Sequence, residues 1–282
     1  MDWFGVLRSN GQDRDLGFFR HLVDPTKPFM DMITAQAQGA LITSAMLGDS
    51  TGDPLHDHEA AKLRSGTRHL AQPALYSRHL SPFSYADQAK IFIIEDLDKQ
   101  DMDALAGAYQ SLFEASKGGA LGLFTSISRL KSVQSRILSA LEMQEIALLS
   151  QHIDAMDASA LIEIFASDTN ACLLGTDALR DGIDVPGLSL RMVVMERVPW
   201  PRPSILHQAR RNAFGGRKYD EILVRFRLKQ AFGRLIRRKD DRGVFVMLDR
   251  AMPSRLLSAF PKDVEITRLG LSEACARVQD FL

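Results

Sequence analysis

The chain alternates between short apolar runs and longer stretches in which apolar residues recur every three or four positions. The runs predict buried strands at residues 89–96, 120–126, 171–179, 190–198 and 243–250, a weaker one near 146–153 and another at 40–47. The periodic stretches predict helices at residues 100–119, 128–141, 158–167, 219–238, 254–260 and 271–282. This alternation favours an α/β fold whose parallel sheet is covered on both faces.

A polar, irregular stretch separates the first predicted strand from the others. It lies between about residues 51 and 87 and is the best candidate for a domain boundary. The sequence contains no internal repeat and no low-complexity linker that would mark another boundary.

The predicted helix at 219–238 ends in the sequence QAFGRLIRR. Gln230, Arg234 and Arg237 are spaced i, i+4 and i+7 and would share one helix face. The opposite face would carry the apolar set Leu228, Ala231, Phe232 and Leu235. The polar face is either a solvated charged surface or a set of guanidinium groups that bind phosphate, and the spacing alone leaves both open.

Charge is unevenly distributed, although the 282 residues contain 35 basic and 35 acidic side chains. Fourteen Lys and Arg but only four Asp and Glu lie between Arg197 and Arg242, so the rest of the chain is acidic. Such a basic segment is typical of a polyanion-binding site, with an ordinary charged surface as the alternative. Trp200 and Phe214 lie within it and are expected either to pack in the core or to stack on bases.

Composition excludes several classes of protein. A hydrophobic content of 45% and a charged content of 25% are those of a globular protein. Two cysteines exclude a disulfide scaffold and a four-cysteine metal or iron–sulfur site within this chain. No apolar run is long enough for a membrane span, and no apolar leader is present, so we expect a cytoplasmic protein. The segment HDHE at 56–59 is expected to be a solvated loop and not a metal site.

Small hydroxyl and acidic residues follow several predicted strands. Thr125 and Ser126 end one strand, Thr176 ends another, and Thr43–Ala45 lie in the run at 40–47. Hydroxyl groups at such positions can bind phosphate oxygens without sequence preference, although the same residues are common in ordinary turns. Parallel strands would bring their carboxyl ends to one edge of the sheet.

Four of these segments, in this order, resemble the second half of a superfamily 2 helicase. TSAML resembles motif III, GLFTSISRL motif IV, GTDALRDGIDVPG motif V and QAFGRLIRR motif VI. The segments SPFSYADQAKIF, RVPWPRPSILHQARR and FGRLIRRKDDRGVFVMLDR resemble the DinG branch of the XPD/DinG-like helicases. The resemblance extends over nearly the whole chain.

The resemblance implies a RecA-like motor in which two domains bind ATP between them. Residues 1–85 would be the end of the first domain, including motif III, and residues 86–282 the second domain. Motif VI would supply Arg234 and Arg237 as arginine fingers, with Gln230 oriented on the nucleotide. The further site residues that we expect are Asp184, Gly182 and Gly233 for the nucleotide, Thr125, Ser126, Thr176, Arg202, Arg210 and Arg211 for single-stranded DNA, and Thr43, Ser44 and Ala45 for coupling hydrolysis to strand movement.

Two helicase motifs are absent from the sequence. It contains neither Gly-x-x-x-x-Gly-Lys-Ser/Thr nor Asp-Glu-x-His, both of which precede motif III in the family. We therefore expect the C-terminal portion of a DinG-like ATP-dependent DNA helicase that does not hydrolyse ATP alone. ATP and Mg²⁺ would be bound mainly by a missing N-terminal RecA-like domain, in cis or on a separate chain, and the iron–sulfur segment of some relatives would also lie upstream.

Two departures from the family pattern concern coupling. Met46 follows Ser44 and Ala45 where the family usually has Thr, and Arg180–Asp181–Gly182 replaces Trp-Glu-Gly. The first change removes a hydroxyl group that is thought to help couple hydrolysis to strand movement.

The main alternative to a helicase is a non-catalytic nucleic-acid-binding or regulatory module that kept the helicase fold. An unrelated phosphate-binding α/β enzyme is disfavoured by the motif order.

Overall fold

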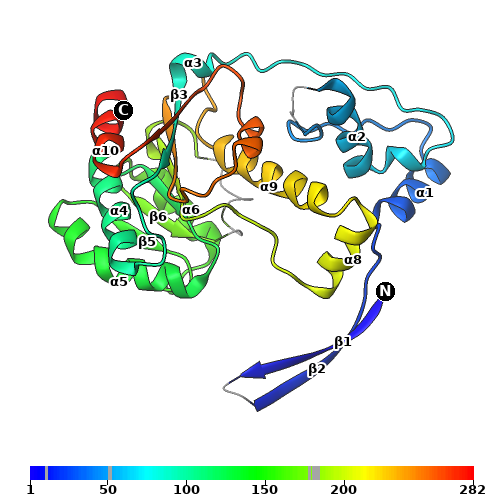
Figure 1. The fold of residues 1–282 in the computed structure, drawn as a ribbon, viewed down its shortest axis with the longest axis horizontal. Helices are drawn as coiled ribbons and strands as arrows, with labels where there is room; N and C mark the ends of the chain where they lie inside the picture. The colour runs from blue at the N-terminus through cyan, green and yellow to red at the C-terminus, as the bar shows by residue number, and fades with distance from the viewer. Residues whose placement is uncertain (10–11, 50–52, 177–178, 180–184) are drawn as a thin grey trace. The chain divides into compact units, whose positions relative to one another are not determined.

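The structure, a computed structural model, describes residues 1–9, 12–49, 53–176, 179 and 185–282. The chain forms two compact units. The first contains Met1–Arg78 and Trp200–Arg225, and the second contains His79–Pro199 and Phe226–Leu282. The division falls within helix α9 (Arg217–Phe232), which Figure 1 shows in yellow.

The second unit is built on a parallel sheet. In its described part, seven strands lie in the order β5-β6-β4-β7-β8-β3-β9, and every neighbouring pair is parallel. The strands are β3 (Ala89–Ile94), β4 (Ala120–Leu123), β5 (Leu148–Ser150), β6 (Cys172–Gly175), β7 (Met192–Met195), β8 (Gly243–Met247) and β9 (Glu265–Leu269). All residues of β4, β6, β7 and β8 are buried, which explains why these strands are continuous apolar runs.

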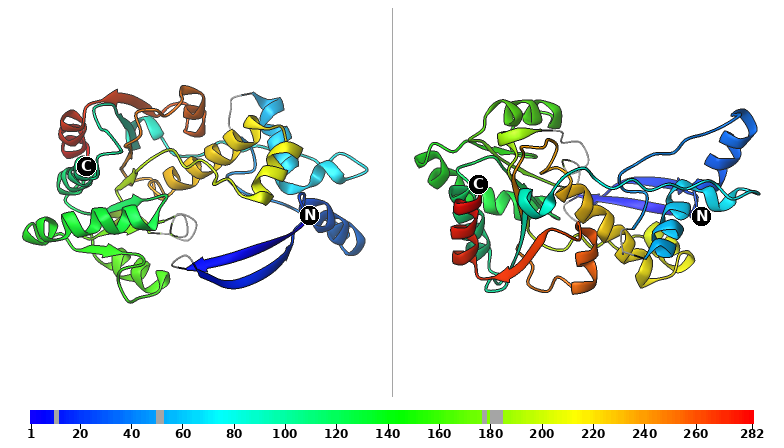
Figure 2. Two further views of the ribbon diagram at one scale, coloured as in Figure 1. Left: turned by 60° about the horizontal axis from the view of Figure 1, so that its bottom comes forward. Right: turned by 90° about the horizontal axis from the view of Figure 1, so that it is seen from above.

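Helices cover both faces of this sheet. They are α3 (Tyr85–Gln88), α4 (Met102–Ala115), α5 (Ile127–Met143), α6 (Ala158–Ser167), the end of α9, and α10 (Leu271–Phe281), with short 3₁₀ turns at Gly187–Ser189 and Ser254–Ala259. Helices α4, α5 and α10 share one core with alternate strand residues such as Val244 and Val246, and α10 lies beside α4 (Figures 1 and 2). The intervening Phe245 points to the other face, where its ring lies 6.5 Å from Phe232 of α9 and 5.2 Å from Phe260.

Local sequence determines where α4 begins and ends. The Asp101 carboxylate accepts hydrogen bonds from the amides of Asp103 and Ala104, which caps the first turn. At the other end, Gly118 and Gly119 have φ of 84° and 59°, as the sequence predicted for a C-terminal stop. A Cβ on Gly118 would lie 2.2 Å from the carbonyl oxygen of Asn170, so glycine is required there.

The first unit has less regular structure. It contains the antiparallel pair β1 (Asp2–Ser9) and β2 (Gln12–Arg20), helices α1 (Thr26–Gln36), α2 (Pro54–Ser65) and α8 (Ile205–Ala213), and the beginning of α9. Large apolar side chains of β1 and β2, including Phe4 and Phe18, are more than half exposed. A two-stranded pair of this kind gains little stability by itself in water.

Buried ion pairs hold the first unit together where its apolar core is small. Arg225 donates from Nε and Nη2 to the two carboxylate oxygens of Asp49, at 3.0 and 2.6 Å, and both residues are buried. Nη1 of Arg64 donates to the carbonyl oxygens of Met46, Leu47 and Gly48 at 2.6, 2.9 and 3.1 Å. The segment before Asp49 is therefore held by side chains and not by a sheet.

The structure confirms most of the predicted elements and corrects two. The strands expected at 89–96, 120–126, 146–153, 171–179, 190–198 and 243–250 are present, as are the expected helices. The predicted strand at 40–47 is wrong: it has no regular structure, and Leu41 is 89% exposed. In the described part of the first unit, β1 and β2 pair only with each other, so residues 40–47 have no strand to pair with. The helix expected at 219–238 ends at Phe232.

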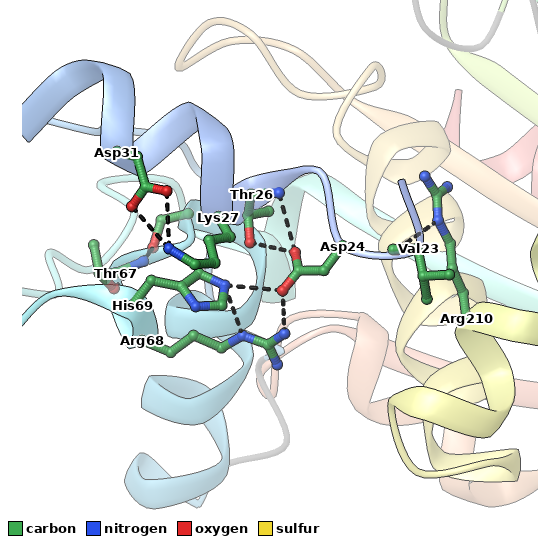
Figure 3. Close-up of polar contacts among 10 residues, drawn as sticks. Val23, Asp24, Thr26, Lys27, Asp31, Thr67, Arg68, His69 and Arg210 are labelled. Atoms are coloured by element: carbon green, nitrogen blue, oxygen red, sulfur yellow. Dashed lines mark hydrogen bonds and ion pairs between the residues drawn. The ribbon is translucent and has the colours of Figure 1, made fainter. Parts of the chain in front are cut away.

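A second polar cluster joins the start of α1 to the 3₁₀ turn Thr67–His69 (Figure 3). The Asp24 carboxylate accepts from the amide and hydroxyl of Thr26 at 3.0 and 2.6 Å, from Arg68, and lies 2.8 Å from Nε2 of His69. Burial disfavours the charged carboxylate, but the hydrogen bonds from Thr26, Arg68 and His69 outweigh it and lower the pKa of Asp24 well below its usual range.

This pKa shift predicts a pH-dependent stability. Because the folded pKa lies below the unfolded value of about 3.9, the charged Asp24 stabilises the first unit fully above that value, and the effect is lost as the pH falls toward the folded pKa. Asp24→Asn should therefore lower the free energy of unfolding by about 1–3 kcal/mol at pH 7, and by progressively less below pH of about 4. Urea unfolding followed by tryptophan fluorescence measures this, because Trp3 and Trp200 both lie in the first unit.

Asp31→Asn is the matched control, since Asp31 pairs with Lys27 at 2.8 Å on the exposed surface of α1. It should change stability little at either pH. A loss for Asp24→Asn that stays constant from pH 7 to pH 3 would contradict the role given to the charge.

Candidate nucleic-acid and nucleotide sites

The carboxyl ends of the parallel strands meet at one edge of the second unit's sheet. Because β6, β4, β7 and β8 are neighbours, the residues that follow them come together there. These residues are Thr125 and Ser126 after β4, Thr176 after β6, Glu196 after β7 and Asp249 after β8. This carboxyl edge is where open α/β sheets usually bind ligands.

Thr125 and Ser126 lie between β4 and α5. Both are half-buried, and the Thr125 amide donates to Oε2 of Glu196 at 3.4 Å. Ser126 is the N-cap residue of α5 and does not cap it with its side chain; its hydroxyl lies 2.7 Å from that of Ser128. The residues predicted from motif IV therefore stand at the start of a long helix.

Thr176 is held by the segment after β5. Its amide and hydroxyl both donate to Oε1 of Gln151, at 2.9 and 3.0 Å, and Nε2 of His152 lies 3.4 Å from the hydroxyl. Gly182 and Asp184, which like Thr176 were predicted from motif V, lie outside the described residues.

Glu196 is the most buried charged residue at this edge, and no sequence motif predicted it. Its side chain is 0% exposed and faces Arg129 of α5 and Arg197. Nearby, Lys99 contacts Asp249 at 2.7 Å. Burial, together with the charge of Glu196, raises the pKa of Tyr109 well above its usual value. The sequence signal for Glu196 was a lone acidic residue directly after an apolar run.

The motif VI residues do not share one helix face, which corrects the prediction for Gln230, Arg234 and Arg237. Helix α9 ends at Phe232, and the amides of Arg234 and Leu235 bond to the carbonyl oxygens of Ala231 and Phe232 in a tightened turn. Gly233 is exposed just beyond the helix, and a Cβ there would lie 3.0 Å from the Lys229 carbonyl oxygen.

Arg234 is half-buried and Arg237 is exposed, each on this turn and not on the helix. Gln230, still on α9, is half-buried, and its Oε1 has no hydrogen-bond partner among the described residues. The expected apolar face is confirmed, since Leu228, Ala231, Phe232 and Leu235 are all buried.

Two side chains fix the turn that carries Arg237. The Asp241 carboxylate accepts from the amides of Arg237 and Arg238 at 2.8 and 2.7 Å. From α3, Nε2 of Gln88 donates to the carbonyl oxygens of Arg238, Lys239 and Asp241 at 3.1, 2.9 and 3.0 Å. These contacts replace the helical hydrogen bonds and explain why the helix stops early.

The predicted DNA-binding arginines of the first unit differ in their contacts and in their exposure. Arg210 donates from Nε to the carbonyl oxygen of Val23 at 3.1 Å (Figure 3), and Arg211 pairs with Asp220 at 2.7 Å. Arg202 is exposed. Phe214 is half-buried with the Arg68 guanidinium 5.0 Å from its ring centroid, while Trp200 is 40% exposed.

The remaining predicted residues lie in the first unit. Thr43, Ser44 and Ala45 are exposed, and the Ser44 hydroxyl accepts from the amide of Met46 at 3.1 Å. HDHE is part of α2 and not of a loop, with Asp57 buried against Arg78 at 2.7 Å. The described residues contain no group of three or more His, Cys, Asp or Glu arranged to hold a metal ion. None of the described helices is long and apolar enough to cross a membrane.

The Gln88 contacts predict how rigid the turn is. Gln88→Ala removes the NH₂ group that the three carbonyl oxygens share, and should lower the free energy of unfolding by about 1–3 kcal/mol. Amides of residues 237–241 should exchange with deuterium faster, as measured by mass spectrometry. Gln208→Ala is the control, because its amide contacts Asn212 on the exposed surface of α8. Unchanged exchange at 237–241 in Gln88→Ala would contradict this role.

Comparison with known proteins identifies the fold. A solved structure of yeast (S. cerevisiae) Dbp5 bound to RNA and ADP BeF3 matches 79% of this chain and 52% of its own, with a TM-score of 0.53 and 15% identity. An apo XPD structure matches 64% of this chain and 40% of its own, with a TM-score of 0.50 and 19% identity. The fold of the second unit is therefore the RecA-like α/β fold of helicase motor domains.

Comparison of sequences identifies the family. The chain is 32% identical over 192 residues to the ATP-dependent helicase DinG of Mycobacterium tuberculosis, a match to 64% of this chain and 28% of the relative. It is 28% identical over 238 residues to the ATP-dependent DNA helicase YoaA of Escherichia coli, covering 80% of this chain and 35% of that one. The chain thus spans about a third of the length of these relatives. The family model described as the helicase C-terminal domain matches residues 109–266, more than half of the chain. The chain therefore belongs to the helicase C-terminal domain family and is a DinG-like member of it.

Proposed function

We propose that this chain is the C-terminal motor portion of an ATP-dependent DNA helicase. The observation that carries the proposal is the match of residues 109–266 to the helicase C-terminal domain family, whose relatives here are named ATP-dependent helicases. Residues 86–282 would act as the second RecA-like domain, and residues 1–85 as the end of the first.

ATP and Mg²⁺ would be held mainly by the rest of the first motor domain, in cis or on a separate chain. The sequence supports this, since it has no glycine-rich phosphate-binding motif. The exposed apolar side chains of β1 and β2, such as Phe4 and Phe18, also support it, because they would gain stability from a covering domain.

Motif VI would complete the ATP site. The γ-phosphoryl group spreads negative charge over its oxygens during transfer, and a planar guanidinium such as Arg234 or Arg237 can meet that charge with two hydrogen bonds. A finger acts only if its backbone is well placed, and Asp241 and Gln88 fix the turn that follows Arg234. Gln230 would orient on the same nucleotide, together with Gly233, Gly182 and Asp184.

The carboxyl edge of the sheet would bind single-stranded DNA. Thr125, Ser126 and Thr176 present hydroxyl and amide groups there, and the first amides of α5 favour a nearby phosphate. Such contacts read the backbone and not the bases, which suits a motor that moves along any sequence. On the first unit, Arg202 would neutralise further phosphates. Arg210 would contribute only its remaining N–H groups, and Arg211 less, because Asp220 offsets its charge.

Thr43, Ser44 and Ala45 would couple hydrolysis to movement. Arg64 fixes the backbone directly after them through three carbonyl oxygens, which would keep the segment in register with Asp49. With Met46 in place of the family's Thr, we expect this coupling to be weaker than in relatives.

The test uses the protein isolated from its own cells, with and without Arg234→Ala. The native product should have a mass well above the 31.4 kDa of this chain and should hydrolyse ATP when single-stranded DNA is present. Arg234→Ala should lower kcat by about a thousandfold or more, the usual effect of losing an arginine finger. Arg238→Ala is the matched control on the same turn and should retain activity.

A different result would favour the alternative of a non-catalytic binding module. That outcome is a native product of about 31 kDa that binds single-stranded DNA in a salt-sensitive way, with an affinity that does not respond to ATP. ATP hydrolysis by the purified 282-residue chain, abolished by Arg234→Ala, would contradict the proposal that another domain holds the nucleotide.

A further inference from the structure

One carboxylate at the end of β7 holds two arginines and a strand end together. Oε1 of Glu196 accepts from Nε of Arg129 and from Arg197, whose Nε and Nη2 lie 3.0 and 2.8 Å away. Oε2 accepts from the Thr125 amide at 3.4 Å. The strand ends of β4 and β7 and the beginning of α5 therefore converge on a single side chain.

Burial makes these contacts obligatory. The Glu196 side chain is 0% exposed, and a charge removed from water needs partners that restore the lost hydration. Arg129 supplies one and is itself mostly enclosed, with 18% of its side chain exposed. Its Nη2 also donates to the Lys99 carbonyl oxygen at 2.7 Å, so this guanidinium has a structural role.

Arg197 differs from Arg129 in exposure and in unused donors. Its side chain is 35% exposed, and its Nη1 makes no hydrogen bond to any described residue. The side of the guanidinium that carries Nε and Nη2 is fixed on Glu196, so the remaining donors have a fixed direction. A guanidinium held in this way loses little conformational entropy when it binds a phosphate.

The charges at this point do not balance. Two arginines face one carboxylate, and among the described residues no other carboxylate forms an ion pair with either. At the end of β8, by contrast, Lys99 and Asp249 form a one-to-one pair, and the Asp249 carboxylate also accepts from the amides of Val198 and Ala251. The surplus positive charge therefore lies after β7, next to Thr125.

We propose that Arg197 is a phosphate-binding residue at the carboxyl edge of the sheet. Glu196 is the positioning residue that orients both Arg197 and Thr125. The inference rests on the proposed function, because it assigns the ligand as the phosphate backbone of single-stranded DNA. It adds a contact that lies outside motifs III to VI, at the start of the basic segment.

The first test is Arg197→Ala in the 282-residue chain, with binding to a fluorescent oligothymidylate measured across a series of salt concentrations. Loss of one phosphate contact to a single strand should reduce the slope of log K against log salt by about 0.7, and should weaken binding about fivefold at 0.1 M salt. Arg136→Ala is the control, because Arg136 lies on the exposed side of α5 and pairs with Asp103 at 2.7 Å.

Glu196→Gln tests the positioning role separately. It removes a negative charge, so an effect of net charge alone would tighten binding, whereas loss of the oriented Arg197 would weaken it. Thermal unfolding by circular dichroism is measured in parallel, since a purely structural role would lower the melting temperature and leave the affinity of the folded protein unchanged. If this variant does not fold, Arg197→Lys tests the positioning role instead, because lysine keeps the positive charge but cannot place Nε and Nη2 together on Glu196. An affinity equal to that of the wild type in Arg197→Lys would overturn the positioning role.

The outcomes are distinguishable. Wild-type protein that shows no salt-dependent binding to single strands contradicts the proposed function itself. Wild-type binding with the same slope in Arg197→Ala overturns only the assignment of Arg197, and tighter binding or unchanged affinity in folded Glu196→Gln overturns the positioning role.

Discussion

The common direction of the strands is the constraint on which the rest of the structure depends. Because β6, β4, β7 and β8 run parallel and side by side, four chain segments that are far apart in the sequence leave the sheet at one edge. Buried apolar strands supply the stability, and the loops at that edge are left to carry polar side chains. This arrangement brings together the residues of the second unit that we propose bind single-stranded DNA, namely Thr125, Ser126, Thr176 and Arg197.

Buried polar side chains then fix what the sheet brings together. Glu196 joins two strand ends, Gln88 and Asp241 hold the turn after α9, and in the first unit Asp49 and Arg225 pair where little apolar core exists. Such groups are sensitive to mutation, because removing one partner from a buried ion pair typically lowers the free energy of unfolding by about 3–5 kcal/mol. They favour one backbone geometry over its neighbours, which is what a phosphate-binding edge or a catalytic arginine requires.

Most strands of the sheet could be predicted from the sequence, because parallel strands that are buried on both faces are continuous apolar runs, as at Val244–Met247. It failed at residues 40–47, which have the same composition as a strand but no neighbour to pair with, since pairing is a tertiary property. The helix through motif VI was extended too far because its periodicity continues past Phe232, while its end is determined by Gln88 and Asp241, which come from elsewhere in the chain or follow the pattern. Glu196 left only the signal of one acidic residue after a strand. Its partner Arg129 is 67 positions away, so their contact was not visible in the sequence.

The most direct test of this account is a map of where single-stranded DNA lies on the protein. Photocrosslinking of the chain to an oligonucleotide that contains 4-thiothymidine, followed by peptide mass spectrometry, gives that map. The account predicts crosslinks in the segments that follow β4, β6 and β7, at residues 124–128, 176 and 196–198. Crosslinks confined to the opposite edge, at residues 117–119 and 170–171 before β4 and β6, would contradict it.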